Sequence, residues 1–583
     1  MASASQLRSE LGSSARPGRL PALPACGRGG RRYLCRPHDD HDATAQPLAI
    51  GQETSLPAAP VIDLQKHLRL RDILSGEKSF PLGIELVSTR GTMGEKQTLK
   101  ARAFAEDLTH SPRVEWVSIT DNAGGNPQLA PMALGTPILY AGKEVVIHLT
   151  CKDLNRHGLE SQLWLLGSQG FHNVLAMTGD YPVESFGGRA KPVFDFDSVG
   201  LLAMIERLNG GLEVASVASR PARRLDSTHF FAGAVTSNFK ARENTLVPQY
   251  YKLERKIENG AKFIINQIGF DARKCHELLE YFRLRNLPKI PVIGNVYVLT
   301  GSVADLFHQM KIPGVVLTDE LHALCKKQAS SPDKGKAFFR EFAAKQLAIF
   351  RGLGYAGGYL GGVHSYRDIE AILDLERSFA PDDWRQFARE ISFSRPGEFF
   401  LFERDPGTGL CQPGVLNREW EESLRTRKSN RNVTVAYRFS KLFHSLVFER
   451  DKGLAKLGAK LCASAKDPSQ GPLLMRWFER ASKSILYTCR DCGDCSLAES
   501  AFLCPESQCA KNQRNGPCGG TRDGRCEVHD YECIWARAYD RLKFEGKSGQ
   551  LLGHTPVIQN QGLRDTSAWA NFWLGKDHTA KKP

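Results

Sequence analysis

Between about residue 80 and residue 363, short apolar runs alternate with longer stretches whose apolar residues recur at helical spacing. The apolar runs span residues 82–87, 114–119, 145–151, 173–177, 230–235, 263–268, 290–299 and 355–363. Helix-like stretches between them span residues 99–108, 158–166, 199–208, 250–258, 273–284 and 337–350. Eight short buried strands that alternate with helices over roughly 300 residues predict an α/β fold, a (β/α)8 TIM barrel.

Polar residues lie at or near the carboxyl ends of these predicted strands. They are Glu85, Thr120, Asp121, His148, Thr150, Thr178, Asp180, Thr236 and Gln267. In a TIM barrel these strand ends meet at one face, and that face carries the chemistry. We therefore expect a functional site there.

Glu85 is the most informative of these residues, because it stands in an otherwise apolar strand. Burial there would raise the pKa of its carboxyl towards the range useful for a general acid. A salt-bridged core glutamate is the alternative interpretation. Likewise, Asp180 would serve as a helix cap and His148 as a satisfied core histidine if the strand ends had no catalytic role.

The alternation stops after about residue 380, and the sequence predicts three parts. Residues 1–58 are rich in Ser, Ala, Gly, Pro and Arg and lack a period, which predicts a disordered N-terminal extension, with an organelle transit peptide as the alternative. Residues 59–380 form the predicted barrel. Residues 381–583 are predicted to contain helices around 437–460 and 473–486, followed by a small cysteine-rich, metal-binding module.

Eight of the fifteen cysteines fall in one window of the C-terminal part. They are Cys489, Cys492, Cys495, Cys504, Cys509, Cys518, Cys526 and Cys533. The first three read C-x2-C-x2-C, a ferredoxin-like run, and eight thiolates suit two four-cysteine iron–sulfur clusters. Two zinc sites are the alternative. A disulfide framework would need an oxidising compartment, which the other seven scattered cysteines do not suggest.

The formal net charge of +14 is spread along the chain and does not indicate nucleic acid as a partner. Residues 411–460 carry a net charge of +6, which suits a solvated helical face or a docking face for an acidic electron-carrier protein. We expect no membrane partner, because no stretch reaches the length of a spanning helix. We expect a cytoplasmic protein, because residues 1–30 lack an unbroken apolar run. An oligomer is compatible with the sequence.

Seven segments occur in the order and register of a known family. They read IELVST (84–89), EWVSITDNAGGN (115–126), VIHLTC (146–151), NVLAMTGDYP (173–182), KPVFDFDSV (191–199), LERKIENGA (253–261) and FIINQIGFD (263–271). Together they resemble methylenetetrahydrofolate reductase over roughly residues 80–375. From FFLFERDPGTG (399–409) onwards, the chain resembles a C-terminal extension of some bacterial reductases. That part is also similar to the small partner subunit of acetogen reductases, which is associated with iron–sulfur clusters and zinc.

The resemblance implies FAD on the barrel and a folate substrate, with hydride transfer between them. It implies that Glu85 is the catalytic acid that helps to open the five-membered ring of methylenetetrahydrofolate. Asp180 and Gln267 are implied to contact the folate. The implied cofactor-binding residues are Thr120, Asp121, Ala123, His148, Thr178, Gly179, Asp180, Lys252, Arg255 and Lys256.

Several positions depart from the family pattern around the pocket that stacks folate or nicotinamide. Val87 follows the first motif where Phe-Pro-Pro is usual, and Thr178 stands where an Arg is common. These departures favour electrons relayed through the cysteine module over NADH as the donor. Two alternatives stay open: the same reductase with NADH as direct donor and structural zinc, and a non-catalytic, zinc-containing scaffold.

Overall fold

The computed structural model describes residues 69–76, 80–214, 221–425, 430–449 and 453–580. The predicted N-terminal extension, residues 1–58, lies outside the described residues. So do several cations of the basic stretch 411–460, namely Arg427, Lys428, Arg450 and Lys452.

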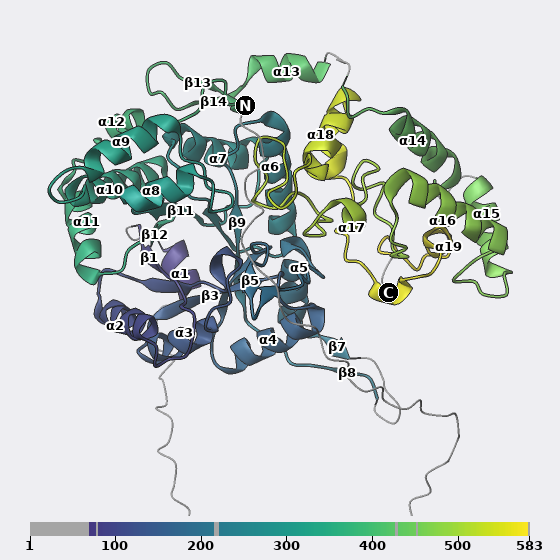
Figure 1. The fold of residues 1–583 in the computed structure, drawn as a ribbon, viewed down its shortest axis with the longest axis horizontal. Helices are drawn as coiled ribbons and strands as arrows, with labels where there is room; N and C mark the ends of the chain where they lie inside the picture. Colours follow the sequence, from purple (N-terminus) through teal and green to yellow (C-terminus); the bar gives the residue numbers. More distant parts are fainter. Residues whose placement is uncertain (1–68, 77–79, 215–220, 426–429, 450–452, 581–583) are drawn as a thin grey trace, which may run out of the picture. The chain divides into compact units, whose positions relative to one another are not determined.

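Eight parallel strands close into a barrel, so the predicted TIM-barrel fold is confirmed (Figure 1). The strands are β1 (Leu82–Leu86), β2 (Trp116–Ile119), β3 (Glu144–Thr150), β4 (Asn173–Met177), β9 (Phe231–Thr236), β10 (Phe263–Asn266), β11 (Val292–Tyr297) and β12 (Gly357–Gly361). Each overlaps an apolar run that the sequence indicated, although β3 begins one residue before its run and β9 ends one residue after its run. Strand β12 pairs with β1 and closes the ring, with Ile84 opposite Leu360.

Helices cover the outside of the barrel. They are α2 (Lys96–His110), α3 (Pro131–Tyr140), α4 (Arg156–Ser168), α5 (Ser198–Asn209), α6 (Glu243–Glu258), α7 (Ala272–Leu284), α8 (Gly301–His308), α9 (Asp319–Ala329), α10 (Lys336–Leu353) and α11 (Tyr366–Ser378). All six helical stretches that the sequence predicted are present. The short helix α1 (Leu70–Ser75) places Leu70 and Leu74 in the same cluster as the side chains inside the barrel.

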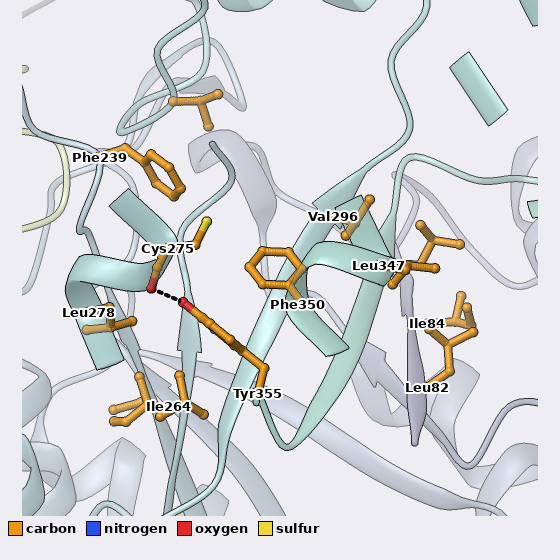
Figure 2. Packing of buried hydrophobic residues seen from close by; sticks show 14 of the residues in the cluster. Leu82, Ile84, Phe239, Ile264, Cys275, Leu278, Val296, Leu347, Phe350 and Tyr355 are labelled. Atoms are coloured by element: carbon orange, nitrogen blue, oxygen red, sulfur yellow. Dashed lines mark hydrogen bonds between the residues drawn. The ribbon is translucent and has the colours of Figure 1, made fainter. Parts of the chain in front are cut away.

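Alternate residues of each strand point into the barrel or out towards the helices. On β10, Phe263 and Ile265 belong to the inner cluster, whereas Ile264 packs with the outer one. Figure 2 shows part of the outer layer, where Phe350 of α10 packs near Val296 and the Tyr355 hydroxyl donates a hydrogen bond to the Cys275 carbonyl, 2.8 Å away.

Glycines let the last strand pack closely. A Cβ at Gly358 would lie 2.7 Å from a Leu347 methyl group, and one at Gly357 would lie 2.7 Å from the Pro81 carbonyl. At Gly361 it would lie 2.6 Å from the Glu85 carboxylate. Gly361 therefore makes room for a side chain of the expected site.

The chain after the barrel forms a hairpin and a set of helices. They are α12 (Trp384–Glu390), β13 (Phe402–Arg404), β14 (Cys411–Leu416), α13 (Arg418–Arg425), α14 (Val435–Val447), α15 (Gly453–Ala463), α16 (Leu473–Tyr487), α17 (Pro505–Gln508), α18 (Ile534–Phe544) and α19 (Ala568–Trp573). The helical stretch expected around 437–460 is thus two helices, one ending at Val447 and the next beginning at Gly453. No helix in the described ranges is both long and apolar enough to cross a membrane.

Helix α16 presents its charged residues inwards and its apolar residues outwards. Arg476, Glu479 and Lys483 are buried and paired with one another, whereas Leu473 and Trp477 are 87% and 66% exposed. Helices α14 and α15 add further exposed apolar side chains. We call this surface the apolar face; its residues are Val435, Phe439, Leu442, Leu446, Leu454, Leu457, Leu461, Leu473, Leu474, Trp477 and Ile485.

The cysteine-rich module and the barrel share a hydrophobic core. Val247 of α6 packs in one cluster with Leu503, Trp535 and Tyr539 of the module. Polar contacts continue this interface: Asn515 donates hydrogen bonds to Asp197, at 2.9 and 3.1 Å. In the described residues, the two parts therefore form one packed unit.

Candidate active site

A cavity of about 260 Å³ lies at the carboxyl ends of the barrel strands. Its lining includes twelve of the residues that the sequence singled out for the barrel: Glu85, Thr120, Asp121, Ala123, His148, Thr150, Thr178, Gly179, Asp180, Lys252, Lys256 and Gln267. The strands bring them together because parallel strands end at the same face of a barrel.

Glu85 lies on β1, and its carboxyl reaches the cavity. Burial raises the pKa of this carboxyl to about 7. The Tyr359 hydroxyl, on β12, lies close enough to offset part of this rise, although it forms no hydrogen bond of normal geometry within the described residues. No cation pairs with Glu85 in the described structure, so the salt-bridged alternative has no partner there.

His148 lies on β3, and its Nε2 is 2.6 Å from the Ser118 hydroxyl of β2. Burial lowers the pKa of the imidazole to about 4, so the ring is neutral at physiological pH. Nearby, the Thr150 hydroxyl donates a hydrogen bond to the Asp121 carboxylate at 2.7 Å. The second and third strands thus offer a polar wall with one carboxylate and no charged imidazole.

Asp180 follows β4 and accepts a hydrogen bond from the Gly124 amide at 2.9 Å. Burial raises the pKa of this carboxyl, and the ammonium of Lys511 opposes the rise. Lys511 belongs to the cysteine module and donates a hydrogen bond to the Gly179 carbonyl at 2.8 Å. Gly179 has a positive φ of 86°, and a Cβ there would lie 3.0 Å from both Lys152 and Thr150 side chains.

Two buried lysines of α6 line the cavity. Lys252 donates hydrogen bonds to the Gln513 side chain at 2.7 Å and to the Gly516 carbonyl at 3.2 Å, and lies 3.9 Å from Asp197. Lys256 donates to the Val235 carbonyl. Burial lowers the pKa of Lys256 to about 7, and the positive charge of Lys252 contributes. Two amines thus lie beside a single carboxylate, Asp197, at this wall.

Arg255 does not line the cavity. Its guanidinium donates hydrogen bonds to the carbonyls of Leu551 (2.9 Å) and His554 (2.9 Å), in the segment after α18. The residue that the resemblance places near the flavin phosphates thus holds the C-terminal segment against α6.

The remaining predicted residues line other parts of the wall. Thr120 accepts a hydrogen bond from the Ser88 amide at 3.1 Å, and the Ala123 amide donates to Gln128 at 3.0 Å. Gln267 accepts from the Ile268 amide at 2.8 Å.

The cysteine module supplies part of the cavity wall, which the sequence did not predict. Its contributions are Lys511, Pro517, Cys518, Gly519, Gly520 and Glu527. Gln249 of α6 donates a hydrogen bond to the Cys518 carbonyl at 2.7 Å. A Cβ at Gly519 would lie 2.7 Å from the Ser237 hydroxyl, so glycine at 519 lets this loop approach β9. The repeated small residues at 516–520 were the only signal in the sequence.

The eight clustered cysteines separate into two groups of four neighbouring thiols. The first quartet is Cys489, Cys492, Cys495 and Cys504. The second quartet is Cys509, Cys518, Cys526 and Cys533. All eight are free thiols, so none of the described cysteines supports a disulfide framework.

Buried cations accompany both quartets. Lys483 lies near Cys495 and Cys489, and Arg514 lies near Cys492 and Cys504. Lys511 and Lys240 lie near Cys518. Burial raises the pKa of Cys489, Cys492, Cys495 and Cys518, and the nearby positive charges oppose that rise. They thereby favour the thiolate, which is the form that binds metal.

Among the described residues, Asp494, Asp577 and His578 bring three ligand atoms within 4.8 Å of one another, and no three cysteine sulfurs do so. Two quartets of thiols suit two four-cysteine sites, for iron–sulfur clusters or for zinc ions.

Two family models match this chain. Residues 69–348 match the model described as methylenetetrahydrofolate reductase, and residues 473–561 match the model described as its C terminal. The first match covers seven of the eight barrel strands, and the second contains both quartets. The chain belongs to the methylenetetrahydrofolate reductase family.

A curated protein with the same family name is similar to part of this chain. Methylenetetrahydrofolate reductase 2 of Schizosaccharomyces pombe is 29% identical over 154 residues, which are 25% of this chain and 22% of the relative. The chain thus matches about a fifth of the length of this relative.

Solved structures align with this chain at low identity. An uncharacterized Clostridium thermocellum protein, described as binding two copies of 5-methyl-5,6,7,8-tetrahydrofolic acid, aligns at 12% identity and a TM-score of 0.38, covering 52% of this chain and 96% of that one. A 2,3-dimethylmalate lyase aligns at 10% identity and a TM-score of 0.30, covering 54% and 86%. With TM-scores this low, neither alignment adds to the barrel topology.

Proposed function

We propose that this protein is a flavin-dependent methylenetetrahydrofolate reductase. It reduces 5,10-methylenetetrahydrofolate to 5-methyltetrahydrofolate or works the same reaction in reverse. The observation that carries the proposal is Glu85, a carboxyl with a pKa of about 7 in the cavity of the matched barrel. A carboxyl that titrates near neutral pH is suited to give and take a proton at a substrate nitrogen.

In the reducing direction, protonated Glu85 donates its proton to the ring nitrogen that leaves when the five-membered ring opens. The resulting iminium carbon then accepts a hydride, so the methyl product gains one proton and one hydride in all. Asp180 and Gln267 are the proposed folate contacts, since both line the same cavity as Glu85. His148, neutral because of its low pKa, adds no positive charge that would repel the iminium.

FAD would supply or accept the hydride, because side chains cannot carry one. The donor set fits its phosphates, since Lys252 and Lys256 line the cavity with one carboxylate, Asp197, beside them. The rest of the proposed flavin-facing wall is Thr120, Asp121, Ala123, His148, Thr178, Gly179 and Asp180. Arg255 is left out of this set because its guanidinium is engaged by the C-terminal segment.

The two quartets are proposed to hold iron–sulfur clusters that exchange electrons between the flavin and a carrier protein. Two features support this: the eight thiols form two quartets, the first of which begins C-x2-C-x2-C, and Cys518 of the second quartet borders the cavity.

The test uses anaerobically purified full-length protein. Flavin, iron and zinc are quantified, and the flavin is followed by stopped-flow after mixing with 5-methyltetrahydrofolate. We expect stoichiometric FAD, iron, and bleaching of the flavin by the folate. Flavin bleached by NADH at the rate of turnover, in a protein with zinc and no iron, would establish direct NADH oxidation instead. A protein that binds no flavin after reconstitution would instead be the non-catalytic, zinc-containing scaffold.

A further inference from the structure

Three chain segments that are well separated in the sequence bring Glu499, His554 and His578 near one another. Glu499 follows Cys495 of the first quartet, His554 follows the short helix η2 (Ser548–Leu551), and His578 follows α19. The carboxylate of Glu499 interacts electrostatically with both imidazoles, and the two imidazoles interact with each other. The proposed reductase chemistry uses none of these side chains.

Each of the three residues has one buried ligand atom without a hydrogen-bond partner among the described residues. These atoms are Oε2 of Glu499, Nε2 of His554 and Nε2 of His578. The side chains of His578 and Glu499 are only 2% and 13% exposed. Buried polar atoms are nearly always paired, because an unpaired one is costly. Three unpaired ligand atoms in one place therefore indicate a bound group that satisfies them.

Both histidines use their other ring nitrogen to donate a hydrogen bond. Nδ1 of His578 lies 2.6 Å from the Asp494 carboxylate, and Nδ1 of His554 lies 2.9 Å from the Thr555 carbonyl. A carboxylate and a carbonyl only accept, so the proton of each pair belongs to Nδ1. Metal-binding histidines almost always donate their second N–H to such a group, which orients the ring and its free nitrogen. Each ring is thus held in the way that suits a metal at Nε2.

The distance between His578 and Glu499 fits two ligands of one ion. Nε2 of His578 lies 3.5 Å from Oε1 of Glu499, and the two atoms form no hydrogen bond of normal geometry. Ligands at about 2.0–2.1 Å from a tetrahedral zinc ion lie about 3.3 Å from each other. Asp577 and Asp494 place two more carboxylates within 4.8 Å of a ring nitrogen of His578, which favours a cation over an anion.

His554 would have to turn towards the other two residues to complete the set. In the described structure, the ligand atoms of Glu499, His554 and His578 do not all lie within 4.8 Å of one another. His554 lies outside the helices, between η2 and the short helix η3 (Gln561–Leu563). Its side chain can therefore rotate without disturbing a helix.

We propose that Glu499, His554 and His578 bind a divalent transition-metal ion such as zinc. Two imidazoles with one carboxylate are a ligand set that zinc accepts, and a water molecule can take the fourth position. This would be a third metal site, with nitrogen and oxygen ligands in place of the sulfur ligands of the two quartets. It would tie the C-terminal part of the chain to the segment after Cys495. Such a site would exist whatever reaction the barrel catalyses.

The alternative is an ion pair without metal. Burial opposes protonation of His578, but its hydrogen bonds to Asp494 and Glu499 raise its pKa to about 10. A metal ion would replace the proton on Nε2, because imidazole binds metal in its neutral form. Metal analysis therefore separates the two states.

The test uses full-length protein that is purified anaerobically, loaded with zinc and passed through a desalting column. Zinc, iron and flavin are then quantified for each chain. His554→Gln and Glu499→Gln should each lower the zinc content by one ion, while iron and flavin stay as in the unmodified protein. Asp494→Asn should keep the site but weaken it by about 10–100-fold in competition with a chelator, because the carboxylate orients His578.

The control is His308→Gln on α8. His308 and His322 form a stacked pair of partly exposed rings, with centroids 4.0 Å apart, and such a pair is where zinc would bind adventitiously. His308→Gln should keep the full zinc content. Zinc should also raise the melting temperature of the unmodified protein with increasing concentration, because only the folded chain has the site, and should leave that of His554→Gln unchanged.

Full zinc content in both His554→Gln and Glu499→Gln would overturn the site, and so would an unmodified protein that retains no zinc outside the quartets. Loss of the ion in His308→Gln would identify an adventitious ion only. Should Glu499→Gln also lose iron, because Glu499 lies close to Cys495 in the chain, the melting temperatures of the unmodified protein and of His554→Gln decide. An equal response of both to zinc would then refute the site.

Discussion

At the scale of single residues, the proposed chemistry depends on one carboxyl and on the space around it. Glu85 titrates near pH 7 because protein surrounds it on an apolar strand. The Tyr359 hydroxyl and the missing side chain of Gly361 shape that environment. The position of the Glu85 carboxyl and its affinity for a proton thus depend on Glu85 itself, on β1, and on Tyr359 and Gly361, on the neighbouring strand β12.

The pKa of Glu85 predicts the pH dependence of folate reduction. The group is protonated below pH 7 and ionised above it, so the rate of the folate half-reaction should fall about tenfold per pH unit above roughly pH 7. Glu85→Gln should remove this dependence and lower the rate by about two to four orders of magnitude. Reduction of the flavin by its donor should be unaffected in the variant. Near-normal folate turnover by Glu85→Gln would refute the assignment.

Gly361→Ala tests the space around the same carboxyl. The new Cβ would lie 2.6 Å from the Glu85 carboxylate, so the acid must move. We expect folate turnover to fall by at least about tenfold while flavin content and melting temperature change little, because a small displacement of a catalytic group is costly. Gly94→Ala is the control, since a Cβ there meets nothing within 4 Å. Equal activity of the two variants would show that the position of Glu85 is not limiting.

At the scale of elements, the sequence predicted the barrel well because its strands are buried on both faces. Runs such as 145–151 and 263–268 therefore read as continuous apolar segments. The strand-end residues Glu85, His148 and Asp180 followed from that pattern. The role of Cys518 in the cavity did not, because a contact between a loop near residue 518 and strands before residue 270 leaves no local pattern. Arg255 shows the same limit, since its carbonyl partners lie almost 300 residues away.

The division of the cysteines into quartets predicts which thiols hold metal. Cys492→Ser should lower the iron content by about half, because the first quartet loses a ligand and the second remains. Cys411→Ser, in the hairpin strand β14, should leave the metal content unchanged, since that buried cysteine belongs to neither quartet. Full iron content in Cys492→Ser, measured by mass spectrometry, would contradict the ligand assignment.

Helix α16 predicts self-association. Its outward residues Leu474 and Trp477 are 80% and 66% exposed, and exposed apolar surface of this extent marks interaction sites. Sedimentation velocity should detect species larger than the monomer as concentration rises. The double substitution Leu474→Gln and Trp477→Gln should shift the distribution towards monomer. The control Arg480→Gln, which changes a charged residue of the same helix, should not. An unmodified protein that is monomeric at all concentrations would contradict the prediction of self-association.

At the scale of the whole molecule, the barrel and the module are bound to each other at the proposed flavin site. Lys252 and Gln249 of α6 both donate to backbone or side-chain groups between residues 513 and 518. The loop that carries these acceptors also carries Cys518. The positions of the loop, of the proposed metal ligand Cys518 and of Lys252 are therefore linked.

This linkage predicts that removal of metal weakens flavin binding. Treatment with an iron chelator should release FAD into an ultrafiltrate, because the loop over Lys252 loses the metal that orders it. The same treatment of Cys411→Ser should give the same release, and chelator that has first been saturated with iron should give none. Stoichiometric flavin in the chelated protein would show that the two sites are independent.

The shared cavity also has a consequence for how the enzyme works at low abundance. Two separate subunits would part on dilution, whereas a tether holds its partners at an effective concentration in the millimolar range. Here Cys518 and Glu85 border one cavity in one polypeptide. Electron exchange between the proposed clusters and the flavin is then first order in enzyme, and only the step with the carrier protein depends on the concentration of a second protein.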